Sequence, residues 1–166
     1  MNVRNRGAST PFSFAILVAF ALVAPFMGNA RAQAPDPASG IVKVKSAYSV
    51  PETIARIKKD VADKGIMWFS EVDQQQLAAK AGIALRPSTL LTFGNPPLGT
   101  LFIKSNPVAG LDWPVRVLVL EDEGGQVWAA YTDFGWIARR HNIDGADAES
   151  FAKASGVIAS ITSSVK

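Results

Sequence analysis

His141 is the only histidine in this 166-residue chain, and it is the side chain best suited to proton transfer at neutral pH. Asp133 lies eight positions before it and Asp144 three after it, so either carboxylate is a candidate to orient the imidazole. A serine hydrolase would also need an exposed nucleophile on a strained turn, and the sequence contains no Gly-x-Ser-x-Gly. His141 and Asp133 therefore form a candidate acid–base pair of a small enzyme. A buried or surface histidine with a structural role is the alternative.

Metal binding by the same residues finds less support in the sequence. His141 with Asp133, Asp144 or the acidic run 121–123 has a suitable composition, but the spacing matches no compact zinc motif. The chain has no cysteine, which excludes thiolate metal sites, disulfides and cysteine nucleophiles. We expect neither a metal nor a cofactor.

A rigid turn offers a candidate binding site instead. Phe93-Gly94-Asn95-Pro96-Pro97 follows an apolar run, and its glycine, asparagine and two prolines are typical of a stiff turn. Such a turn can present Asn95 to a polar ligand, or it can simply end a strand. Arg140 beside His141 forms a local positive patch that suits a carboxylate or phosphate. The sequence predicts ligand contacts at Asn95, Tyr131, Asp133, Arg140 and His141.

Strands and helices of recognisable pattern must position these side chains. Ile41 to Lys45 alternates as a strand does, and Ser49-Val50-Pro51-Glu52 is a helix start whose apolar face runs to a stop at Gly65. We expect further strands over 66–69, 88–93, 115–120 and 127–131, and helices over 74–81, 134–141 and 151–165. Residues 100–105 suit a helix or a strand, and a short helix capped near Gly99 is the preferred prediction. The order predicts an α+β fold in which two long helices pack on a mainly antiparallel sheet.

The first 32 residues are typical of a cleaved secretory signal. Arg4 and Arg6 precede the apolar run 14–24, and Ala30-Arg31-Ala32 is a small-x-small pattern, so we expect cleavage after Ala32 and a periplasmic location without a permanent membrane anchor. Residues 33–40 would be a flexible lead-in, and 41–166 a single domain.

The charge balance depends on this leader. The chain has 17 basic and 14 acidic residues, and the leader holds three arginines and no acid. The remaining 14 basic residues equal the 14 acidic ones, so the sequence gives no support to nucleic-acid binding.

Several short runs in the mature part resemble a known bacterial family, domain of unknown function 302. They are Gly65, Phe93-Gly94-Asn95-Pro96, Asn106-Pro107, Gly110-Leu111-Asp112-Trp113-Pro114, Glu121-Asp122, Tyr131-Thr132-Asp133 and Ala138-Arg139-Arg140-His141. The chain departs from the family pattern at Trp113, where leucine is commoner, and at Phe134, where proline is usual. The resemblance covers about 41–166 and implies an α+β fold of TATA-binding-protein-like topology and a homodimer, without an established activity. The expected function is a small-ligand or partner-binding module, with a small enzyme or an envelope interaction or stress protein as the alternatives.

Overall fold

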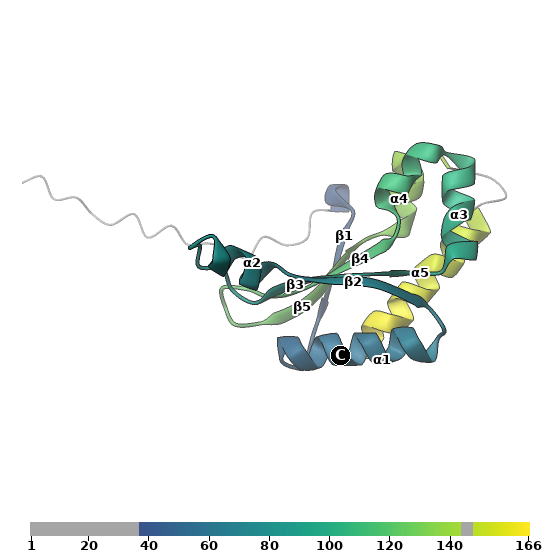
Figure 1. Cartoon of the computed structure of the whole chain (residues 1–166). Helices are drawn as coiled ribbons and strands as arrows, with labels where there is room; N and C mark the ends of the chain where they lie inside the picture. Colours follow the sequence, from purple (N-terminus) through teal and green to yellow (C-terminus); the bar gives the residue numbers. More distant parts are fainter. Residues whose placement is uncertain (1–36, 144–147) are drawn as a thin grey trace, which may run out of the picture. The chain divides into compact units, whose positions relative to one another are not determined.

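The computed structural model describes residues 37–143 and 148–166, in which two long helices lie on one face of a five-stranded sheet (Figure 1). The strands are β1 (Ile41–Lys45), β2 (Met67–Asp73), β3 (Ser88–Gly94), β4 (Val115–Glu121) and β5 (Val127–Thr132). Their order across the sheet is β1-β5-β4-β3-β2, and every neighbouring pair is antiparallel. The α+β fold with an antiparallel sheet is therefore confirmed.

The helices divide between one face of the sheet and its two ends. They are α1 (Val50–Asp63), α2 (Gln74–Lys80), α3 (Pro96–Ser105), α4 (Phe134–Arg140) and α5 (Ala148–Ser163), with short 3-10 turns η1 (Pro37–Ser39) and η2 (Pro107–Asp112). In Figure 1, α1 and α5 run beneath the sheet, α3 and α4 stand at one end, and α2 stands at the other. The expected long helix after Ser49 and the expected hairpin of β4 and β5 are both present.

Helix α1 begins and ends where the sequence predicts. The Ser49 hydroxyl accepts a hydrogen bond from the Glu52 amide at 3.4 Å, and Pro51 occupies the first turn, where a missing N–H costs nothing. Gly65, with φ of +60°, follows the C-terminal end and turns the chain back into β2. The helix buries one face, which includes Ile57 and Val61, against the sheet.

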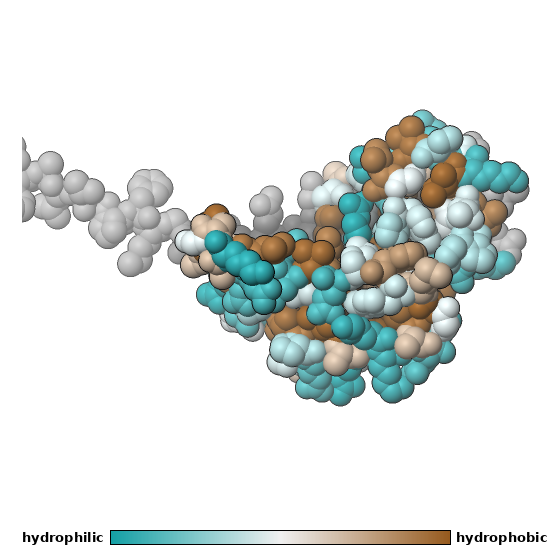
Figure 2. Space-filling model, in the orientation of Figure 1, coloured by the Kyte–Doolittle hydropathy of each residue, from teal (hydrophilic) through white to brown (hydrophobic). Residues whose placement is uncertain are grey.

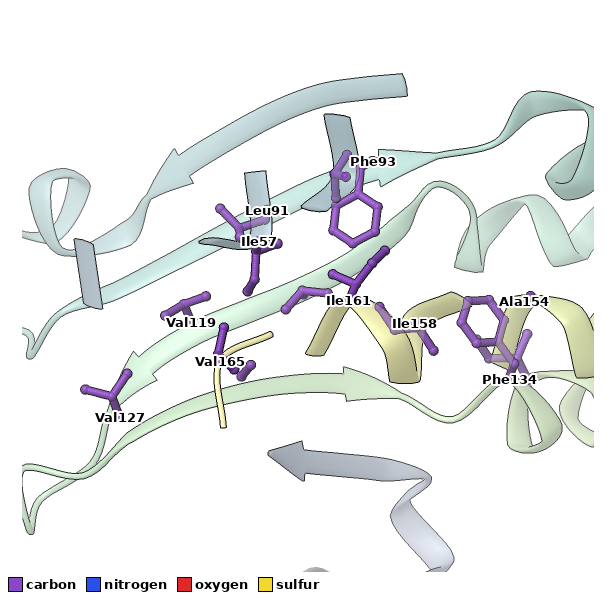
Figure 3. Close-up of a cluster of buried hydrophobic side chains, with 14 of the residues drawn as sticks. Ile57, Leu91, Phe93, Val119, Val127, Phe134, Ala154, Ile158, Ile161 and Val165 are labelled. Atoms are coloured by element: carbon purple, nitrogen blue, oxygen red, sulfur yellow. The ribbon is translucent and has the colours of Figure 1, made fainter. Parts of the chain in front are cut away.

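The core lies between the sheet and the two long helices. Leu91 of β3 pairs with Val117 of β4, and both side chains are fully buried because alternate residues of each strand face the helices. Figure 3 shows Ile57 of α1 and Ile161 of α5 approaching this face from the helix side. Each such side chain stabilises the fold by roughly 1.5–3 kcal/mol relative to an exposed one.

The start of α3 differs from the sequence prediction. We expected the helix over 100–105 with a cap near Gly99, but it begins at Pro96 and its cap is Asn95. The Asn95 Oδ1 accepts from the Leu98 amide at 3.1 Å, and proline is favoured in a first helical turn. The stiff turn predicted around Asn95 is thus the beginning of helix α3.

The last residues of the predicted lead-in, 33–40, contact helix α4. Residues 37–39 form η1, and Gly40 is buried against α4. The Trp136 indole donates to the Ala38 carbonyl at 3.1 Å, and its ring fills the space beside Gly40. Residues 1–36, which include the leader and its cleavage site, and residues 144–147, which include Asp144, lie outside the described residues.

Candidate functional site: an apolar cavity at one end of the sheet

A cavity of about 310 Å³ opens between the ends of the sheet and helices α3, α4 and α5. This volume is within the range of small-molecule sites. Eleven of the thirteen lining residues are apolar or glycine: Ile66, Phe93, Gly94, Leu98, Trp113, Val115, Phe134, Ala154, Val157, Ile158 and Ile161. Figure 3 shows Phe93 of β3, Phe134 of α4 and Ile158 of α5 around this end of the core.

Trp113 forms a wall of the cavity by lying over two glycines. A Cβ added at Gly99 would be 2.2 Å from Cε2 and Cζ2 of the indole, and one added at Gly94 would be 2.5 Å from Cη2. Contacts that short do not occur between real carbon atoms, so both positions must lack a side chain for the indole to occupy this place. The two glycines therefore fix the position of an aromatic wall.

Two polar side chains complete the lining. Lys64 closes α1, and its Nζ is 2.6 Å from Oδ2 of Asp60, one turn earlier on the same helix. Asn95 is exposed at the end of β3. An apolar interior with a few polar groups is the usual build of a small-molecule site, in which apolar contact provides affinity and polar groups fix orientation.

His141 lies in a separate, buried cluster around Asp112. The His141 Nε2 is 2.6 Å from Oδ2 of Asp112, and each side chain is only 5 % exposed. Arg116 and Arg140 reach the same carboxylate at 3.1 and 3.2 Å. Side chains from β4, from α4 and from the residue that follows α4 thus converge on one acid at the end of η2, which holds these elements together.

Asp133, predicted with Asp144 as a residue that could orient His141, has a different role in the structure. The Asp133 Oδ1 accepts from the Trp136 amide at 2.8 Å and caps α4, while the partner of His141 is Asp112. The physical reason is that Asp133 and His141 lie at opposite ends of α4: Asp133 is its N-cap and His141 its C-cap. Among the described residues, the carboxylate hydrogen-bonded to His141 is that of Asp112.

The hollow beside this cluster is too small for an organic ligand. It borders Asp112, Arg116 and Phe134 and has a volume of about 10 Å³, which at most holds one water. Arg140, predicted to receive a ligand anion, is occupied by the Asp112 carboxylate and also lies 5.5 Å from the centre of the Trp136 ring.

Tyr131 faces α5 from β5 and meets Thr162. Burial raises the pKa of Tyr131 above its usual value; the nearby Asp133 carboxylate adds to the rise and the Thr162 hydrogen bond opposes it. The phenol therefore stays protonated at neutral pH. Of the five predicted contact residues, Asn95 borders the cavity, and the other four lie elsewhere.

Sequence reasoning missed the residues that shape the site. Trp113, Gly99 and Asp112 come together only through the packing of α3 and η2 on the sheet end. The run from Gly110 to Pro114 and the glycines on both sides of Asn95 were the available signals, but their spacing matches no known chemical motif.

Two further properties bear on function. Within residues 37–143 and 148–166 there is no group of three or more His, Asp or Glu side chains placed to hold a metal ion. In the same ranges, no helix has both the length and the apolar character needed to cross a bilayer.

The sequence profile of the family "Domain of unknown function DUF302" matches residues 42–161, which is more than half of the chain. The chain belongs to this family. The crystal structure of an uncharacterized conserved DUF302 protein from Bacillus stearothermophilus superimposes with a TM-score of 0.69, covering 76 % of this chain and 98 % of that one. At 17 % identity this likeness establishes the shared DUF302 fold alone.

Part of this DUF302 chain is also similar to proteins named as fluoride-specific ion channels. It is 41 % identical over 105 residues to fluoride-specific ion channel FluC 1 of Brucella suis biovar 1 (strain 1330), which is 63 % of this chain and 41 % of that protein. Fluoride-specific ion channel FluC 2 of Brucella melitensis biotype 1 gives 41 % identity over 105 residues, or 39 % of its length. The chain thus spans about two fifths of these relatives.

Proposed function

We propose that this DUF302 domain binds a small, largely apolar molecule in the cavity walled by Trp113. The observation that carries the proposal is a hollow of about 310 Å³ lined almost entirely by apolar side chains, with its polar groups confined to Lys64 and Asn95. Apolar surface that stays uncovered costs free energy, and a ligand that covers it recovers roughly 25 cal/mol per Å². Binding would also reduce the freedom of α3 and α5 on either side.

The test is a titration calorimetry experiment with a neutral aromatic probe, 1-naphthalenemethanol. We expect saturable binding of one probe per chain. Ala154, on the buried face of α5, lines the cavity, so Ala154→Leu places a larger side chain there and abolishes binding. Ala159→Leu, on the exposed face of the same helix, is the matched control and leaves binding unchanged. Equal binding by both variants would refute the proposal.

A second candidate function is suggested by the fluoride-channel relatives. Their extra length leaves room for a part that this chain does not match, and an ion channel needs a part that spans the membrane. We propose that the channel activity resides in that other part and that the DUF302 domain acts beside it as an accessory binding domain. Fluoride-electrode measurements of efflux from proteoliposomes holding a FluC channel, with and without this chain, test this: an unchanged rate speaks against it.

We also propose export and self-association for this chain. Export rests on the signal-like pattern of residues 1–32, and the mass of the protein recovered from its host tests it.

Self-association rests on the sheet face opposite the helices, where Leu90, Leu118 and Ala130 form one cross-strand row and are only half-buried. Light scattering of the purified chain and of Leu118→Lys tests it: a dimer in the wild type and a monomer in the variant are expected.

A further inference from the structure

We infer that the natural ligand of the cavity is an organic acid, whose carboxylate or similar anionic group binds Lys64 and Asn95 while its apolar body contacts Trp113. This inference rests on the proposed function, because it assigns the chemical class of the molecule that the same cavity takes. It goes further by predicting which functional group the ligand must carry and where that group sits.

Lys64 supplies the charge. It is the only ionisable residue among the thirteen that line the cavity, and its side chain is 31 % exposed. Its Nζ contacts the Asp60 carboxylate at 2.6 Å. An ammonium group has three N–H donors, and this contact uses one of them, so the group can bind a second anion without releasing the first.

Asn95 supplies a directional donor. Its Oδ1 is used in capping α3, where it accepts from the Leu98 amide at 3.1 Å. The Nδ2 group is therefore at the other side of the amide, and no acceptor for it is found in the described part of the chain. Because Pro96 and Pro97 have no N–H, the first turn of α3 offers no backbone donor there, and the side-chain amide is the group that can bind an acceptor.

The lining of the cavity favours an anionic ligand head group over a cationic or a neutral one. The rest of the lining is apolar, so an ion pair at its edge is weakened less by water than one on the open surface. A cationic head group would meet the Lys64 ammonium, and Asp60 is not among the lining residues. A neutral hydroxyl would bind the same donors without the added strength of a charged hydrogen bond. An acid is the class that fits.

Three probes with one naphthalene ring test the inference on the full chain at pH 7.5: 1-naphthoic acid, 1-naphthalenemethanol and 1-naphthylmethylamine. We expect the acid to bind about tenfold more tightly than the alcohol, and the amine most weakly. Lys64→Met should remove that about tenfold advantage, because the acid loses a charged hydrogen bond and the alcohol loses only a weaker one. Lys64→Arg, which keeps the charge, should retain most of the preference.

The matched control is Lys59→Met. Lys59 forms the same kind of pair on the same helix, with Asp63 at 2.5 Å, but lies outside the cavity lining. It should leave the affinities for all three probes unchanged, and circular dichroism of each variant verifies its fold. The comparison of acid with alcohol on the wild type needs no variant and stands even if Lys64→Met does not fold.

The outcomes separate the inference from the proposed function. Equal affinity for acid and alcohol on the wild type, or an acid preference that persists in Lys64→Met, overturns the inference and leaves the cavity as a site for neutral apolar molecules. Binding of none of the three probes overturns the proposed function itself.

Discussion

The indole of Trp113 occupies the position that a side chain at Gly99 would need: its Cε2 and Cζ2 atoms are 2.2 Å from where a Cβ would be placed. Gly99 is buried within α3, and Trp113 is the residue that follows η2, so the contact packs the end of η2 against α3. The same indole also covers Gly94, so the ring packs against the backbone of helix α3 and the backbone of strand β3 at once. The aromatic wall of the cavity is therefore set by two missing side chains.

Gly99→Ala should destabilise the protein and weaken the binding of an aromatic probe. The added methyl group displaces the indole, and overpacking of this kind costs about 2 kcal/mol. The displaced ring also changes the space available to a ligand. Urea unfolding measures the free energy of unfolding, and calorimetric titration with 1-naphthalenemethanol measures the affinity.

Gly156→Ala is the control for this change. In the described part of the chain, a Cβ at Gly156 in α5 would meet no atom within 4 Å beyond the backbone of its own helix, so alanine should raise the stability by up to about 1 kcal/mol through its higher helix propensity. If Gly99→Ala were as stable as Gly156→Ala, the packing of Trp113 on α3 would not be as described.

Asp112→Ala should cost about 3 kcal/mol of folding free energy. The carboxylate is 5 % exposed and contacts the buried His141 and the half-exposed Arg116 and Arg140, so its removal takes the partner from a buried imidazole and breaks two ion pairs. Chemical denaturation of the variant measures the loss. Asp63→Ala, which breaks an exposed pair with Lys59 on α1, should cost far less. Similar losses in the two variants would show that the buried cluster does not hold α4 and η2 together.

Asp122 should make stability depend on pH in the acid range. The pKa of Asp122 is held below its usual value, chiefly by the Trp128 indole, which donates to Oδ2 at 2.7 Å, and also by the amides of Gln126 and Gly124. A lowered folded-state pKa adds stability that is present above the unfolded value of about 3.9 and is lost as the pH falls through the folded value. Stability curves of the wild type and Asp122→Asn should therefore differ at pH 7 and converge below about pH 4. Parallel curves would contradict this assignment.

Regular elements of the chain were predictable because their signals are local. The Ser49 cap, the four- and three-residue spacing of apolar residues in α1, and the stop at Gly65 act within a few turns of helix. The β4–β5 hairpin is local in the same sense, since its two strands are joined by a short turn. The sequence singled out Asn95 as a polar residue at the end of a strand. It did not predict that Asn95 caps α3, which therefore begins earlier than expected.

The site was not predictable because its contacts join residues far apart in the chain. His141 pairs with Asp112, 29 positions away, while the nearer Asp133 is used to cap α4. No spacing rule distinguishes a carboxylate that caps a helix from one that binds a histidine. The cavity depends on the packing of Trp113, Phe134 and α5, which only the folded chain brings together.

The most direct test of the proposed binding site is to locate a bound probe by nuclear magnetic resonance. With 1-naphthalenemethanol in excess, we predict intermolecular Overhauser effects from the probe ring to the methyl groups of Ile158 and Ile161 and to the Trp113 indole, all of which line the cavity. Figure 2 shows apolar residues exposed over α2, where Leu77 and the following Ile83 and Leu85 are more than two fifths exposed, and these provide the competing surface. Effects to the methyl groups of Leu77 and Ile83, with none to Ile158 or Ile161, would contradict the account.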